Sequence, residues 1–271
     1  MARKDLVFAL TWQRNTEPVG AAVTELLRWL GREVGRTIVP RVALSYEEIF
    51  PLFQRNAVDF AWLPPLSYLR LRHDDLARTL CVNKRLAAYH GVLAVRANGR
   101  YQSLDKLQGA RVAWVDPHST TGYILARLDL IARGVDPKTT LGEERFYGSH
   151  DAAARAVFDG RSDLLGTFAE FDGQDLVRAG FSSLGEPADW RILLRGSESP
   201  PDVLAVHTSV DADLAAAVKR ALFSAAENEA SRARVRDAFH VGGFAEPDES
   251  RYAAFEATVE EARRRGLLPH L

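Results

Sequence analysis

The sequence predicts an α/β protein composed of two lobes. Short apolar runs of strand length alternate with stretches in which apolar residues recur at helical spacing, a pattern typical of a mostly parallel sheet covered by helices. The alternation occurs in two successive sets, one on either side of about residue 90. The chain has 271 residues, enough for two modest domains that each bury a core.

The first set begins with the apolar run 6–10, which we expect to be a core strand. Leu26, Leu27 and Leu30 then lie on one face of a helix through about 34. Strands are expected at 38–44 and 58–63. Between them, Ser45 is expected to cap a short helix, with Glu48 three residues later as in a capping box and Pro51 shortening the helix.

The second set is expected to repeat the pattern and to end in a helical segment. Strands are expected at 87–95, 111–115, 145–147, 163–168, 191–194 and 203–206, and helices at 104–107, 119–133, 149–158 and from 211 onward, with an interruption at 241–243. Periodicity leaves open how the two lobes connect.

Composition excludes several classes of protein. Lys and Arg number 35 and Asp and Glu number 36, so the formal net charge of −1 speaks against a strongly basic surface for nucleic acid. No apolar run approaches the roughly 20 residues that span a bilayer, so we expect no membrane insertion. The single cysteine, Cys81, forms no intrachain disulfide and no Cys-based zinc site.

The N-terminus leaves two alternatives for the compartment. Charged residues precede the apolar run 6–10, but this run is too short for the core of a signal peptide. If Met1 is the native start, we expect a cytoplasmic protein; if an export signal was removed, we expect a periplasmic or extracytoplasmic one.

The segment 112–123 predicts an anion-binding site. A buried strand ends at a proline turn, and Ser119, Thr120 and Thr121 open the next helix. The first N–H groups of a helix have no internal partners and carry partial positive charge, so with these hydroxyls they can hold a tetrahedral oxyanion. The alternative is that Ser119 or Thr120 is an ordinary N-cap.

A second strand-to-helix junction lies at 146–153. It places His150 in the first turn of a helix, where a histidine can donate to a bound anion. The alternative is a surface or capping histidine.

These segments together resemble a known family. Residues 116–123, D-P-H-S-T-T-G-Y, are similar to the D-P-x-S-T-S-G-Y/F segment of the phosphonate-binding proteins, the substrate-binding components of phosphate, phosphite and phosphonate ABC transporters. G-S-H-D at 148–151 matches the same family, and 58–68 resembles its V-D-I/F-A-W-x-G-P-L-S-Y. Pro64 stands where the family usually has glycine and removes an N–H donor.

The resemblance implies a type II periplasmic-binding-protein fold with the ligand in a cleft between the lobes. The implied lobes are 1–91 plus 204–271, and 92–203. The implied function is binding of a small phosphonate, phosphate or related oxyanion and its delivery to an ABC permease. A cytosolic or tethered ligand-sensing domain of the same fold is the alternative.

The resemblance also implies the site residues. Ser119, Thr120 and Thr121 would hold the phosphonate oxygens, helped by His150, Tyr46 and Tyr89. Family members that bind aminoalkylphosphonates use a Glu and an Asp for the ammonium group, and Glu170 and Asp202 fall at the corresponding places. The alternative for both acids is a solvated loop carboxylate.

Catalysis is the least favoured interpretation. Ser119, His150 and Asp116 or Asp151 contain the elements of a hydrolase set, but no G-x-S-x-G elbow surrounds Ser119. The histidines show no paired spacing such as H-E-x-x-H. We therefore expect a protein that is not an enzyme and that uses no metal ion and no cofactor.

Overall fold

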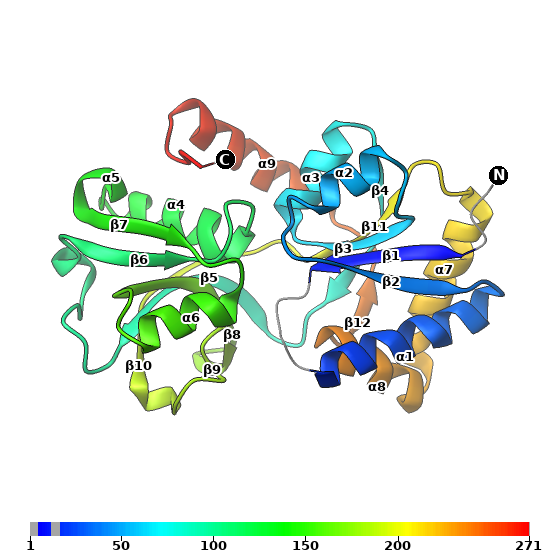
Figure 1. Cartoon of the computed structure of the whole chain (residues 1–271), viewed down its shortest axis with the longest axis horizontal. Helices are drawn as coiled ribbons and strands as arrows, with labels where there is room; N and C mark the ends of the chain where they lie inside the picture. The colour runs from blue at the N-terminus through cyan, green and yellow to red at the C-terminus, as the bar shows by residue number, and fades with distance from the viewer. Residues whose placement is uncertain (1–4, 12–16, 271) are drawn as a thin grey trace. The chain divides into compact units, whose positions relative to one another are not determined.

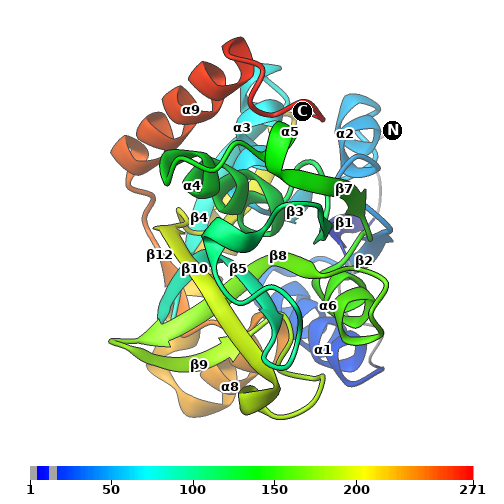
Figure 2. The ribbon, with the colours of Figure 1, turned by 90° about the vertical axis from the view of Figure 1, so that its left-hand side faces the viewer.

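The computed structural model describes residues 5–11 and 17–270, so Met1, on which the alternatives for export depend, lies outside it. The chain forms two compact units: unit 1 comprises Met1–Leu86 and Pro200–Ala253, and unit 2 comprises Ala87–Ser199 and Ala254–Leu271. Among the described residues, each unit contains a six-stranded mixed sheet with helices on its faces (Figures 1 and 2). The predicted α/β class is confirmed.

The division differs in part from the predicted one. The chain passes between the units after Leu86 and after Ser199, a few residues before the expected positions. It passes a third time within helix α9 (Glu249–Arg264), whereas we expected all of 204–271 in the first lobe. The C-terminal segment belongs with unit 2 because the buried Arg127 donates from Nε to the Leu267 carbonyl at 2.9 Å.

Unit 1 has the strand order β12-β4-β11-β3-β1-β2. Its elements are β1 (Leu6–Thr11), α1 (Glu17–Val34), β2 (Ile38–Ala43), α2 (Ile49–Gln54), β3 (Phe60–Leu63), α3 (Pro65–His73), β4 (Ala77–Lys84), β11 (Val203–His207), α7 (Ala212–Ser224), η4 (Ala225–Glu227), α8 (Glu229–Phe239) and β12 (Gly243–Ala245). Strands β1, β2 and β3 are parallel, whereas β11 runs antiparallel to both β3 and β4.

Burial on both faces explains the apolar strands of this sheet. Helices α1, α7 and α8 cover one face, and α2 and α3 cover the other (Figure 1). Phe8 and Phe60 pack with Leu26 and Leu30 of α1 in one core. The expected N-cap Ser45 is wrong: α2 begins at Ile49, and the Glu48 carboxylate instead accepts from Leu44 N at 2.8 Å.

Unit 2 has the strand order β10-β5-β8-β6-β7, with β9 paired to β8. Its elements are β5 (Ala88–Arg96), η1 (Leu104–Lys106), β6 (Ala110–Trp114), η2 (Thr120–Leu125), α4 (Ala126–Ala132), α5 (Pro137–Thr140), β7 (Leu141–Phe146), α6 (His150–Phe158), β8 (Leu164–Asp172), β9 (Asp175–Ala179), η3 (Pro187–Asp189) and β10 (Trp190–Glu198). Strands β6, β7 and β8 are parallel, and β5 is antiparallel to β8 and β10.

Helices α4 and α6 lie on opposite faces of this second sheet (Figures 1 and 2). Ala113 and Leu165 point toward the alanines of α6, while their neighbour Trp114 is buried on the opposite side, where it contacts Tyr123. The alternation along each strand therefore serves two apolar layers. Within the described part of the chain, no helix combines the length and apolarity needed to cross a membrane.

Candidate oxyanion-binding site

The predicted residues of unit 2 gather at one edge of its sheet. Because β6 pairs in parallel with β7 and β8, their carboxyl ends reach the same edge and lead to Ser119, to His150 and to Glu170. Strand β5 is antiparallel to β8, so its first residues also lie there, with Tyr89 directly opposite Glu170. The carboxyl edge is where open α/β sheets commonly bind ligands.

The loop after β6 is held by its own side chains. The Asp116 carboxylate accepts from His118 N at 2.8 Å, and Ser119 N donates to the Asp116 carbonyl at 2.9 Å. Ser119 is the N-cap of the following helical turn, and its hydroxyl accepts from Gly122 N at 3.1 Å. The N-cap alternative thus describes Ser119 correctly, and a capping serine still has an O–H to donate.

The turn that follows is π-helical rather than α-helical. In η2, Ile124 N donates to the Ser119 carbonyl at 3.1 Å, a span of five residues. Such turns are rare and occur mostly at functional sites. Gly122 is required here because a Cβ would lie 2.3 Å from Cγ2 of Val115. The glycine of this motif therefore allows η2 to pack directly on the end of the sheet.

Thr120 has an unsatisfied buried hydroxyl. Its side chain is only 3% exposed, and Oγ1 has no hydrogen-bond partner among the described residues. Leaving a buried polar group without a partner costs about 1–3 kcal/mol, so such a group in a native protein calls for an explanation. Ser119 and Thr121 on either side are also buried. The hydroxyl cluster has the composition of an anion-binding turn.

His150 opens α6 beside this turn. The Ser149 hydroxyl caps the helix by accepting from Ala152 N at 3.1 Å, and His150 Nδ1 lies 2.7 Å from Thr167 Oγ1. Gly148, with φ of 80°, donates to the Val115 carbonyl at 2.7 Å and ties the two loops together. The structure therefore places a buried, oriented histidine next to the loop that carries Ser119.

Phe168 contacts two of the predicted site residues, Tyr89 and His150, although it was not itself predicted as a site residue. Its ring stacks on Tyr89 with centroids 4.9 Å apart and meets the His150 ring edge-on at the same separation. Its partner across the ladder is Gly91, where a Cβ would lie 3.2 Å from the Thr121 carbonyl oxygen. The signal that was available is Thr167 and Phe168, a hydroxyl and an aromatic residue that follow the aliphatic start of the strand.

Glu170 is a mostly buried strand residue rather than a solvated loop carboxylate. It lies within β8, opposite Arg178 of β9, and the two side chains form an ion pair. Arg178 was not among the predicted site residues, because its strand was not predicted.

The other two predicted residues belong to unit 1. Tyr46 lies in the turn before α2, where its carbonyl accepts from Ile49 N at 3.1 Å. Asp202 immediately precedes β11, and its carboxylate lies 3.7 Å from the Arg85 guanidinium.

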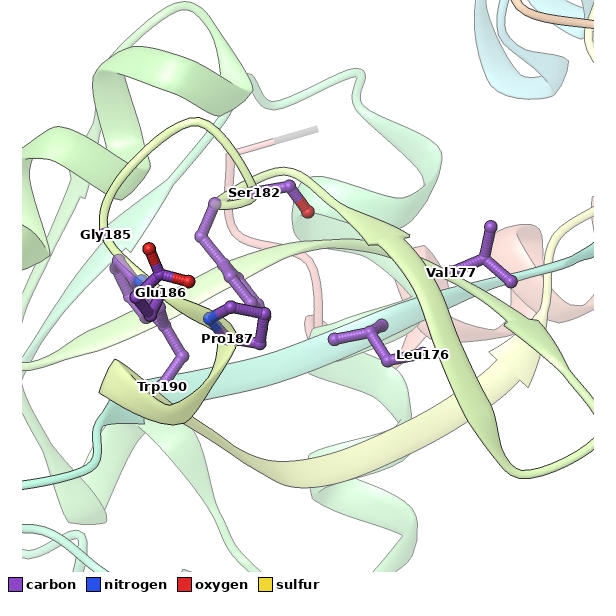
Figure 3. A pocket seen from close by; sticks show the side chains of 8 residues that line it. Leu176, Val177, Ser182, Gly185, Glu186, Pro187 and Trp190 are labelled. Carbon is purple, nitrogen blue, oxygen red and sulfur yellow. The ribbon is translucent and has the colours of Figure 1, made fainter.

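Two further features of unit 2 bear on its chemistry. Burial raises the pKa of Tyr123 to about 12, so its phenol stays protonated even near pH 10, where an exposed tyrosine is half ionised. A cavity of about 60 Å³ near β9 is lined by Leu176, Val177, Phe181 and Trp190 among others (Figure 3). Its mostly apolar lining includes none of the predicted site residues.

No group of His, Cys, Asp or Glu in the described ranges is arranged to hold a metal ion.

Two α/β units with mixed sheets, between which the chain passes repeatedly, define a protein of the type II periplasmic-binding-protein class. The family model for the phosphonate periplasmic substrate-binding protein of ABC transporters matches residues 8–252. The chain belongs to this family, which is one of binding proteins and not of enzymes.

Solved structures share the fold at low sequence identity. A binding-protein component of a phosphonate ABC transporter from Pseudomonas aeruginosa is 16% identical with a TM-score of 0.80, over 93% of this chain and 84% of that one. PhnD1 from Prochlorococcus marinus, in complex with methylphosphonate, is 17% identical with a TM-score of 0.79, over 97% and 99%. A protein from Xanthomonas citri bound to chloride is 21% identical with a TM-score of 0.76, over 97% and 100%.

Proposed function

We propose that this chain binds a small phosphonate or a related tetrahedral oxyanion at the carboxyl edge of the unit 2 sheet. The observation that carries the proposal is Thr120, whose buried hydroxyl has no partner in the described residues. An oxyanion beside it would accept that hydrogen bond.

The neighbouring groups suit the same ligand. The run from η2 into α4 is continuous from Thr120 to Ala132, so its first N–H groups present a positive dipole end. Ser119 and Thr121 add hydroxyl donors, and His150 is oriented by Thr167. Tyr89 stacks on Phe168 at the same edge. In this proposal these side chains contact the oxygens, and Tyr46 of unit 1 remains a predicted contributor. Glu170 and Asp202 were predicted only for a ligand that carries an ammonium group.

The transport role follows from the family. Its members are periplasmic components of ABC transporters, so we propose that this chain also works outside the cytoplasm and delivers its ligand to an ABC permease. The methylphosphonate bound to the Prochlorococcus marinus relative supports a phosphonate as the ligand class.

Calorimetry with phosphate, phosphite, methylphosphonate and 2-aminoethylphosphonate tests the proposal. We expect at least one of these oxyanions to bind, and a ligand present at 100 times its Kd should add about 2.7 kcal/mol to the free energy of unfolding. A generic phosphoester should not be turned over. The absence of binding by all four ligands would contradict the proposed function.

A further inference from the structure

Both acids that were candidates for binding a ligand ammonium already have an arginine partner. Asp202 in unit 1 lies 3.7 Å from the Arg85 guanidinium. Glu170 in unit 2 is paired with Arg178. The charge of each carboxylate is thus balanced within its own unit. A ligand therefore does not need to carry a cation to balance it.

The pair formed by Glu170 and Arg178 is well defined. The two residues lie directly opposite each other across the β8–β9 ladder. Arg178 Nε donates to Glu170 Oε2 at 3.3 Å, and Arg178 Nη2 donates to Glu170 Oε1. This two-bond arrangement is the strong form of an arginine–carboxylate contact. The side chains are 25% and 14% exposed, so water screens the pair only in part.

Phe168 holds the guanidinium from a second side. The Arg178 Cζ atom lies 4.9 Å from the centroid of the Phe168 ring, within the range of a cation–π contact. The same ring stacks on Tyr89 and touches His150. Arg178 therefore belongs to the same group of side chains as the residues proposed to bind the anion.

We propose that Arg178 is a specificity-determining residue that makes this a site for oxyanions without an amine, such as phosphate, phosphite or methylphosphonate. This inference rests on the proposed function. An ammonium group that approached Glu170 would meet a like charge and would have to displace a guanidinium held by two hydrogen bonds and an aromatic ring. The arrangement penalises aminoalkylphosphonates as well as removing their partner.

Paired titrations of methylphosphonate and 2-aminoethylphosphonate test this inference. We expect the wild-type protein to bind 2-aminoethylphosphonate no more tightly than methylphosphonate. In Arg178→Met, the freed Glu170 carboxylate should shift the ratio of the two Kd values toward the amine-bearing ligand by at least about tenfold, the effect of one hydrogen bond between charged groups. Arg178→Gln should shift it in the same direction.

Two controls isolate the effect. Arg195→Met removes another guanidinium that lies on a phenylalanine of β8, 4.0 Å from the centroid of Phe171, and should leave the ratio unchanged. The double variant Glu170→Gln with Arg178→Met should lose the gain in 2-aminoethylphosphonate binding. Retained methylphosphonate binding shows that each variant is folded.

Three results would contradict the inference. Tighter binding of 2-aminoethylphosphonate than of methylphosphonate by the wild-type protein would overturn the inference without any variant. A folded Arg178→Met protein with an unchanged ratio would overturn it as well, while leaving the proposed function intact. A wild-type protein that binds none of the oxyanions would overturn the proposed function and the inference together.

Discussion

Thr120 carries a buried hydroxyl that lacks a partner in the described residues, and this determines what its replacement should do. Thr120→Val keeps the shape of the side chain and removes the polar atom. A hydrogen bond to a charged group contributes about 1.5–3 kcal/mol, so oxyanion affinity should fall roughly 10- to 150-fold. The free energy of unfolding without ligand should be unchanged or slightly higher. Calorimetry and denaturant titration measure the two effects, with Thr258→Val on the exposed face of α9 as the matched control.

Ser119 should respond differently from Thr120, because its hydroxyl also caps η2. Ser119→Ala should lower both the oxyanion affinity and the free energy of unfolding, the latter by about 1 kcal/mol. If Ser119→Ala lowered stability alone, with affinity unchanged, the serine would be a cap and nothing more.

Cys81 offers a residue-level probe of unit 1. It is the single cysteine, it is buried in β4, and burial raises the pKa of its thiol well above the usual range. The reactive thiolate is therefore suppressed in the folded state at pH 8. We expect labelling by a disulfide reagent to be negligible without denaturant and to follow the unfolding of unit 1. Rapid labelling of the native protein would contradict this burial.

At the scale of elements, the turn η2 depends on a close approach that only glycine allows. In Gly122→Ala, the new methyl group would meet Val115 at 2.3 Å and the Ser119 hydroxyl at 2.8 Å. Overpacking of this kind costs typically 1–3 kcal/mol. We expect a lower thermal midpoint and weakened oxyanion binding at temperatures where the variant is still folded. A variant with wild-type midpoint and affinity would show that the packing of η2 on β6 does not shape the site.

Periodicity was a good guide to elements that are buried on both faces. The apolar strands β1, β3 and β6 lie close to the predicted positions. Strand β4 was missed because its apolar run, 80–82, is only three residues long, with Arg78 before it and Asn83 and Lys84 after it. In the structure, β4 nevertheless pairs with β11 and β12 inside the sheet. Tertiary pairing outweighs local pattern there.

The site residues could be predicted where a local sequence motif contains them. They could not be predicted where the pairing of distant strands brings them together. Ser119 and His150 stand at strand-to-helix junctions that the sequence shows directly. Arg178 reaches Glu170 only through the pairing of β9, an edge strand whose exposed residues have no amphipathic pattern. The π-helical form of η2 was not predicted either, because the spacing of apolar residues does not distinguish a single π-helical turn from an α-helical one.

At the scale of the whole molecule, the C-terminal segment completes the core beneath η2. Arg127 is 1% exposed; it pairs with Glu144 and donates to the Leu267 carbonyl. The Glu144 carboxylate also accepts from Trp114 Nε1 at 2.7 Å, and the His270 ring lies 6.2 Å from that of Tyr123 in η2. A buried cation needs all its partners, because each lost acceptor leaves charge uncompensated.

A chain that ends at Arg265 should therefore be less stable and bind oxyanions less tightly. Loss of the Leu267 acceptor should cost about 1–3 kcal/mol of unfolding free energy. Arg127→Leu should cost more, about 3–5 kcal/mol, because it also leaves Glu144 without its guanidinium. Because both changes remove the same hydrogen bond, the truncated Arg127→Leu protein should lose less than the sum of the two separate losses. Denaturant titrations of the four proteins measure this coupling. Strict additivity would mean that the segment after Arg265 stabilises unit 2 independently of Arg127.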